Sequence, residues 1–154
     1  MKIELLCSRP EYVNDVARMI HTEFVVKKGG EMTFAEVVAY FSNAGDKRFP
    51  ITFIALEGER CIGTVSLFEN DWKERKQYTP WLASLYTGSA HRGKGAAQRL
   101  MDQARNKARE LGYRELYLRT EEASAYYRAR GWDPVETVIG EKGRTVAIFR
   151  RDLE

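Results

Sequence analysis

The stretch between Trp81 and Gly112 restricts the fold more than any other part of this 154-residue chain. Trp81–Thr87 is apolar and aromatic, with the length and composition of a β-strand. Gly88–Lys94 supplies turn residues, and from Gly95 onward apolar residues recur at helical spacing. Gly112 stands where helices commonly carry a C′ glycine. The stretch therefore predicts a strand, a tight turn and a long helix in succession.

The turn before this helix combines small side chains with positive charge. The residues concerned are Arg92, Gly93, Lys94, Gly95, Ala96 and Ala97. The first turn of a helix has backbone N–H groups without intrahelical partners and the positive end of the helix dipole, and a bound phosphate satisfies both. We therefore expect either a cradle for a pyrophosphate or, as the alternative, a tight strand–helix turn with two basic surface residues.

Two other phosphate-binding motifs do not fit this turn. A P-loop requires Lys and then Ser or Thr after its second glycine, and no such pair follows Gly95. A dinucleotide-binding fingerprint requires a third glycine where this chain has Gln98. An ATP- or NAD-binding domain is therefore disfavoured.

At this turn the chain resembles the GNAT N-acetyltransferases. Arg92-x-x-Gly95-x-Ala97 is similar to the R-x-x-G-x-[GA] signature of that family, which also follows a strand and opens a long helix. The resemblance implies an enzyme that moves an acetyl group directly from acetyl-CoA to a primary amine of unknown identity. The alternative is a non-catalytic sensor of acetyl-CoA or coenzyme A, or a partner-binding module.

A second segment, Ala123 to Trp132, resembles the family pattern A-x-x-x-Y-x-x-x-G-[FW]. The resemblance places Tyr127 as the catalytic acid that protonates the departing thiolate, a role that a phenol with a pKa of about 10 can fill at neutral pH. The alternative is that Tyr126 and Tyr127 are both core aromatics. Since neighbouring helix positions lie about 100° apart, we assign Tyr126 to packing.

The remaining coenzyme contacts are expected along the predicted strand and after the next one. The candidates are Leu85, Tyr86 and Thr87, through their backbone groups, and Thr120, where many relatives have an Asn. The N–H of Leu85 is placed to polarise the thioester carbonyl. Three acids of the polar loop that ends at Pro80 are candidates for a general base, although a solvated loop is the simpler interpretation; they are Glu69, Asp71 and Glu74.

The order of predicted elements is β-α-α-β-β-β-α-β-α-β-β, which indicates an α/β (α+β) fold. We expect a single domain over residues 1–154, with a mixed, mostly antiparallel sheet of about seven strands and four helices on both faces. The predicted strands are Ile3–Cys7, Ile51–Leu56, Cys61–Phe68, Trp81–Thr87, Glu115–Arg119, Val135–Ile139 and Thr145–Arg150. Capping boxes at Ser8–Glu11 and Thr33–Glu36 predict two helix starts, and Glu121-Glu122 a third. The resemblance implies that the strands at 81–87 and 115–119 run parallel and splay apart to admit coenzyme A.

Composition excludes several other classes. Hydrophobic residues make up 44% and charged residues 31% of the chain, as in globular proteins, and no apolar run reaches the roughly 18 residues of a membrane span. The net charge of +3 is spread over the chain, which disfavours nucleic-acid binding. Cys7 and Cys61 lie in apolar runs and predict buried free thiols in a reducing cytoplasm. No His or Cys spacing predicts a metal site.

The resemblance also implies where the acceptor binds. It points to the region after the first helix, Val25–Met32, and to the closing hairpin loop, Gly140–Gly143. Both regions mix lysines and glutamates, including Glu141, so the acceptor could be a small-molecule or a peptide amine. Homodimers are common among relatives.

Overall fold

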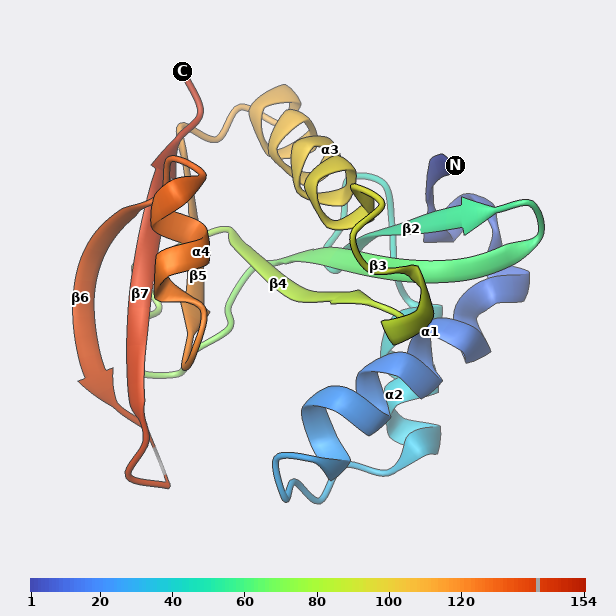
Figure 1. The fold of residues 1–154 in the computed structure, drawn as a ribbon, viewed down its shortest axis with the longest axis horizontal. Coiled ribbons are helices and arrows are strands. Elements are labelled where there is room, and N and C mark those ends of the chain that lie inside the picture. The colour runs from blue at the N-terminus through green and yellow to red at the C-terminus, as the bar shows by residue number, and fades with distance from the viewer. Residues whose placement is uncertain (141) are drawn as a thin grey trace.

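The computed structural model describes residues 1–140 and 142–154, so Glu141 of the predicted acceptor loop lies outside the described residues. Seven strands form one sheet in the order β1-β2-β3-β4-β5-β7-β6 (Figure 1). The strands are β1 Lys2–Leu5, β2 Ile51–Glu57, β3 Arg60–Phe68, β4 Trp81–Thr87, β5 Glu115–Thr120, β6 Asp133–Ile139 and β7 Thr145–Asp152. Only β4 and β5 pair in parallel within these ranges, and the other neighbours are antiparallel. The predicted mixed, mostly antiparallel sheet is confirmed.

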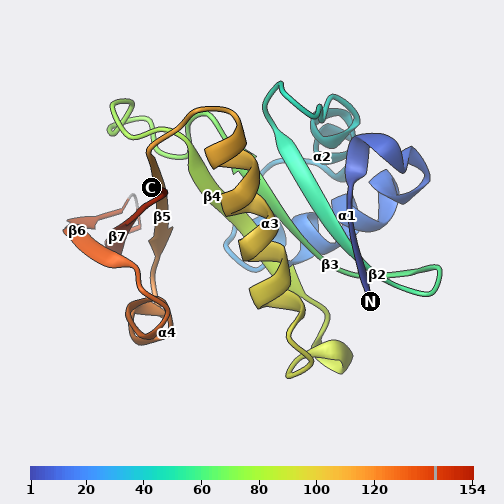
Figure 2. The same cartoon turned by 90° about the horizontal axis from the view of Figure 1, so that it is seen from above.

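Four α-helices cover the sheet on both faces, as predicted (Figures 1 and 2). They are α1 Val13–Ile20, α2 Phe34–Ser42, α3 Ala96–Glu110 and α4 Ser124–Ala129. A π-helical turn, His21–Val26, continues α1. Helix α3 lies on one face of β2–β4, and α1 and α2 lie on the other (Figure 1). None of these helices is long and apolar enough to cross a membrane.

Helix α3 is anchored by a stripe of buried side chains that faces the sheet. The stripe consists of Ala96, Leu100, Met101, Ala104 and Ala108. It begins at Ala96, the first residue of the helix, directly after Gly95. At the other end, the N–H of Gly112 bonds the carbonyl of Arg109 at 3.0 Å and the N–H of Tyr113 bonds that of Ala108 at 3.1 Å. With Gly112 at φ 94°, these two bonds form a Schellman motif around the C′ glycine that the sequence predicts.

The N-terminal segment departs from the prediction. The Thr33 capping box is present, but the box at Ser8–Glu11 is not, and α1 begins only at Val13. The Arg9 guanidinium binds the carboxylates of Glu4 and Glu11, which removes Glu11 from the capping role. The chain therefore passes through short 3₁₀ turns at residues 6–8 and 10–12. Cys7 lies in the first of these turns and is exposed, so the prediction of a buried thiol was wrong for Cys7 and right for Cys61.

The parallel pair β4–β5 separates almost as soon as it forms. Trp81 and Tyr117 are its one registered pair, next to a bond from the N–H of Tyr117 to the carbonyl of Pro80 at 3.1 Å. Beyond this point β5 follows β7 along its whole length, and the sheet opens between β4 and β5 (Figure 2). The splayed strands implied by the resemblance are therefore present.

Candidate functional site

The opening between β4 and β5 forms a cleft of about 810 Å³. One side is formed by Leu82–Leu85 of β4, and the other by Leu118–Ala123 at the end of β5 together with Tyr127 of α4. Three of the predicted site residues, Leu85, Thr120 and Tyr127, thus line one cleft although they come from three different elements. These three residues could line one cleft only if β4 and β5 splay apart, and the structure has this arrangement.

A bulge distorts β4 where it borders the cleft. Thr64 of β3 is opposite Tyr86, but Ser66 is opposite Ala83, so β4 contains one extra residue in this interval. Ser84 takes up the bulge with a positive φ of 54°. Past Trp81, the edge of β4 that faces β5 has no strand partner in the described chain, so an extended, amide-bearing ligand can pair with it.

Strand β4 leads directly to the turn before α3. Gly93 and Gly95 have φ angles of 80° and 83°, in the left-handed region that favours glycine. A Cβ atom at either residue would meet no atom within 4 Å. The two glycines are therefore required for the backbone conformation of the turn. From the sequence alone, we explained them by their small size, which leaves room for a phosphate.

The N-terminus of α3 has the properties of an anion site. Gly95 is its N-cap, no side chain caps it, and its first turn contains no acidic residue. Its free N–H groups and helix dipole can therefore bind a phosphate. Ala97, in the first turn, is partly exposed, while Ala96 is buried against the core.

The two basic residues of the turn are both exposed but differ in their contacts. Arg92 Nε donates to the carbonyl of Thr87 at 3.1 Å, and its guanidinium lies 5.9 Å from the Tyr86 ring. Lys94 Nζ lies 3.8 Å from a carboxylate oxygen of Glu57. Arg92 thus fixes the turn to the end of β4. In addition, Thr87 Oγ1 is buried without a hydrogen-bond partner among the described residues.

Tyr127 is held in the cleft wall by aromatic contacts. Its ring centroid lies 6.2 Å from that of Trp132 and 6.4 Å from that of Phe149. Burial raises the pKa of Tyr127 to about 12, with a smaller contribution from Tyr126, so the phenol is protonated at neutral pH. Tyr126 does not line the cleft and instead packs under the Arg130 guanidinium, 3.5 Å from its ring centroid. The two rings meet edge to face, with centroids 5.1 Å apart, but only Tyr127 lines the cleft.

Thr120 lines the cleft, but its hydroxyl has a local partner. The N–H of Ala123 donates to Thr120 Oγ1 at 3.0 Å. This bond stabilises a turn in front of α4, which begins at Ser124. The prediction that Glu121-Glu122 open the helix was therefore wrong by about one turn.

Of the three loop acids, Asp71 and Glu74 line the cleft, whereas Glu69 does not. Arg119 Nε lies 2.9 Å from Asp71 Oδ2, and the same guanidinium lies 5.0 Å from the Trp72 ring. Burial raises the pKa of Asp71 and the Arg119 charge opposes this effect. Arg119 and Trp72 were not predicted as site residues, because no local pattern joins side chains from the loop and from β5.

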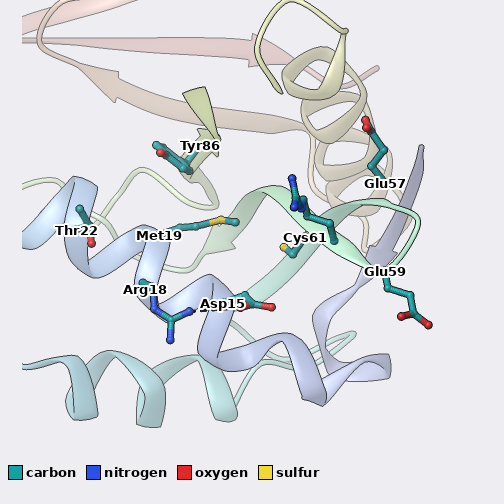
Figure 3. A pocket seen from close by; sticks show the side chains of 9 residues that line it. Asp15, Arg18, Met19, Thr22, Glu57, Glu59, Cys61 and Tyr86 are labelled. Atoms are coloured by element: carbon teal, nitrogen blue, oxygen red, sulfur yellow. Dashed lines mark hydrogen bonds and ion pairs between the residues drawn. The ribbon is translucent and has the colours of Figure 1, made fainter. Parts of the chain in front are cut away.

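A second, more open hollow of about 720 Å³ lies between α1 and the ends of β2–β4 (Figure 3). Figure 3 shows the Met19 side chain extending from α1 toward Cys61 of β3, with Tyr86 of β4 above them. The Tyr86 side chain therefore borders this hollow and not the cleft. Only the backbone of Tyr86 is available for the predicted coenzyme contact.

Comparison with known proteins places this geometry in context. The model of the acetyltransferase (GNAT) family matches residues 14–132. Among solved structures, an N-acetyltransferase from Staphylococcus aureus Mu50 aligns with 21% identity and a TM-score of 0.78, with all of both chains covered. No curated protein sequence matches this chain significantly.

Two further structures of the same fold contain the coenzyme, according to their descriptions. An aminoglycoside 6′-N-acetyltransferase complexed with coenzyme A aligns with 13% identity and a TM-score of 0.80, covering 100% of this chain and 98% of the other. The yncA protein from Salmonella typhimurium with its cofactor acetyl-CoA aligns with 14% identity and a TM-score of 0.72, covering 100% and 94%.

Proposed function

Because this chain belongs to the acetyltransferase (GNAT) family, we propose that it moves an acetyl group directly from acetyl-CoA to a primary amine. One observation carries the proposal: a protonated tyrosine faces a cleft whose other wall, β4, leads to an uncapped helix N-terminus. An acid at one end and an anion site at the other suit a long, phosphate-bearing thioester.

The residues present fit coenzyme A along this path. The backbone amides of residues 93–97, with Arg92 and Lys94, would hold the pyrophosphate. The unpaired edge of β4 at Leu85–Thr87 would bind the pantetheine amides, with Thr120 on the facing wall.

The chemistry assigned to the chain is modest. Acetyl-CoA supplies the activated thioester when bound. The N–H of Leu85 would polarise the acyl carbonyl. As the amine nitrogen bonds to the acyl carbon and the C–S bond breaks, Tyr127 Oη would donate its proton to the departing sulfur. The proton that the amine loses would pass through solvent and return Tyr127 to its protonated form. Holding the amine next to the acyl carbon accounts for much of the remaining acceleration.

An acyl-cysteine intermediate is not part of the proposal. Neither cysteine lines the cleft. Burial raises the pKa of Cys61 to about 11, and its thiol donates to the carbonyl of Gly63 at 3.6 Å. Cys7 lies in an exposed 3₁₀ turn.

Two unpaired thiols, one exposed, also support a reducing compartment such as the cytoplasm.

We propose a small-molecule amine as acceptor. The cleft has the volume of a typical small-molecule site, and two of its walls come from the segments where the acceptor was expected, around Lys28 and Lys142. The name of one structural relative, an aminoglycoside 6′-N-acetyltransferase, gives this class a place in the first screen. A homodimer stays a prediction.

A steady-state screen tests the proposal. Acetyl-CoA is incubated with aminoglycosides, polyamines, amino acids and peptide amines, and thiol release is followed. We expect release above the hydrolysis background for at least one small amine, together with coenzyme A binding by calorimetry. Binding without amine-dependent release would favour the sensor, and absence of binding would contradict both functions.

A further inference from the structure

Three segments that are distant in the sequence are joined at one carboxylate. Glu121, between β5 and α4, lies 3.4 Å from Lys28 Nζ and 3.5 Å from Arg144 Nη1, in both cases through Oε2. Lys28 follows the π-helical turn after α1, and Arg144 belongs to the β6–β7 hairpin. Two ion pairs thus connect the three segments, and the Lys28–Glu121 pair joins residues 93 positions apart in the sequence.

A further contact closes the ring between two of these segments. Lys142 Nζ of the β6–β7 hairpin donates to the backbone carbonyl of Lys28. Gly29, at φ 72°, leaves room for this ammonium, because a Cβ there would lie 2.9 Å from Lys142 Nζ. The hairpin and the connection after α1 therefore meet directly as well as through Glu121.

This cluster, which we name the clasp (Lys28, Glu121, Lys142 and Arg144), belongs to the cleft. All four residues line it. The same two segments contribute Phe24 and Ile139, which also line it and are 37% and 67% exposed. In Figure 1 the connection after α1 and the β6–β7 hairpin lie at the same end of the molecule. The clasp thus bridges a cleft mouth that has apolar sides.

We propose that Glu121 is a specificity-determining residue, which restricts the cleft to slender amines by holding its mouth closed. The inference rests on the proposed function, since the coenzyme would occupy the opening between β4 and β5 and leave this mouth to the acceptor. Glu121 is 30% exposed and its partners 44% and 45%, so the clasp is accessible to solvent and can open. We expect a slender amine to enter while the clasp is intact, whereas a bulky one requires the clasp to break.

The test compares Glu121→Gln with Glu122→Gln in the full chain. Glu122 also lines the cleft but forms no ion pair with the described residues, so the two variants remove equal charge from neighbouring positions. Hydrogen exchange is measured by mass spectrometry. We expect exchange at residues 25–32 and 142–146 to be about threefold faster in Glu121→Gln and unchanged in Glu122→Gln. Raising the salt concentration should accelerate these segments in the wild type but not in Glu121→Gln.

Specificity is measured with phenethylamine as the slender amine and kanamycin as the bulky one. The ratio of kcat/KM for kanamycin to that for phenethylamine should rise about fivefold in Glu121→Gln, with unchanged coenzyme A affinity. Equal behaviour of the two variants in either measurement would overturn the proposal. Absence of turnover by every protein would also overturn the specificity role, and coenzyme A calorimetry would then show whether the proposed function fails too.

Discussion

At the scale of single residues, Tyr127 carries the clearest expectation. Tyr127→Phe keeps the ring contacts with Trp132 and Phe149 but removes the proton donor. We expect kcat to fall about 100-fold, as for the loss of a general acid, with coenzyme A affinity nearly unchanged. Tyr126→Phe, in a ring outside the cleft, is the matched control. An unchanged kcat in Tyr127→Phe would remove this residue from the mechanism.

The pKa of Tyr127 makes the same assignment testable by pH. The donor is present below its pKa and is lost as the pH rises through it. Burial raises this pKa to about 12, so the wild-type rate should show no loss from Tyr127 up to pH 10. A fall in kcat near pH 9 that disappears in Tyr127→Phe would contradict the buried phenol.

Gly95 is the residue at which backbone geometry and binding meet. An alanine there would meet no neighbouring atom, so its effect comes from the φ of 83°. Gly95→Ala should lower the free energy of unfolding by about 1–2 kcal/mol and weaken coenzyme A binding. Gly112→Ala is the control, because Gly112 has a φ of 94°, equally open surroundings and a place at the opposite end of α3. We expect both variants to lose similar stability and only Gly95→Ala to bind coenzyme A more weakly. If neither variant changed coenzyme A affinity, the coenzyme would bind elsewhere.

The position of a side chain was predictable where the signal is local. Two adjacent tyrosines must point in different directions on a helix, which separated Tyr127 from Tyr126. The contact of Asp71 with Arg119 was not predictable, because the two residues are 48 positions apart and only the fold brings them together. The hydroxyl of Thr120 likewise binds Ala123, a contact that depends on where α4 begins.

At the scale of elements, the N-terminus of α3 allows binding and stability to be separated. Ala97→Glu places a carboxylate in a first turn that has no acid, so the helix dipole should stabilise the protein by about 0.5 kcal/mol. The same carboxylate would repel a pyrophosphate, and coenzyme A affinity should fall more than about tenfold. Calorimetry and urea unfolding give the two values. Ala97→Gln adds comparable bulk without charge and should lose less affinity; retained affinity in Ala97→Glu would mean that the cradle is misplaced.

Helix ends were predictable where a local residue sets them, and were not predictable where a contact with a distant residue does. The end of α3 is set by Gly112, with a φ angle of 94°, and was predicted. The start of α1 was not, since Arg9 draws Glu11 into an ion pair that also involves Glu4 of β1. Capping motifs therefore indicate a helix start only when no stronger partner competes for the capping side chain.

At the scale of the whole molecule, the cleft depends on one parallel pair that does not continue. Residue patterns indicated strands at β4 and β5, but the parting after Trp81 and Tyr117 came only from the family resemblance. The bulge at Ser84 distorts β4 just past this pair, and the stacked Tyr78 and Tyr117 rings, with centroids 4.6 Å apart, pack where the strands still touch.

The folded molecule also holds protons that the unfolded chain would release in alkali. Burial raises the pKa of Cys61 from 9.0 to about 11, and that of Tyr40, Tyr117 and Tyr127 from 10.0 to about 12. Stability from a raised pKa is complete below the unfolded value and is lost as the pH rises toward the folded one. The free energy of unfolding should therefore fall from about pH 9, with Cys61 alone contributing on the order of 2–3 kcal/mol by pH 11.

Urea unfolding at pH 8, 9 and 10 measures this loss, and two alanine variants locate its origin. Cys61→Ala should be less stable at pH 8 because it leaves a small cavity, yet it should lose less stability between pH 8 and pH 10 than the wild type. Cys7→Ala removes an exposed thiol and should follow the wild-type curve. A wild-type midpoint that stays constant to pH 10, or a Cys61→Ala curve parallel to it, would mean that the Cys61 thiol ionises as readily in the folded protein as in the unfolded chain. The packing of β3 against α1 and α2 would then be looser than the buried position of Cys61 indicates.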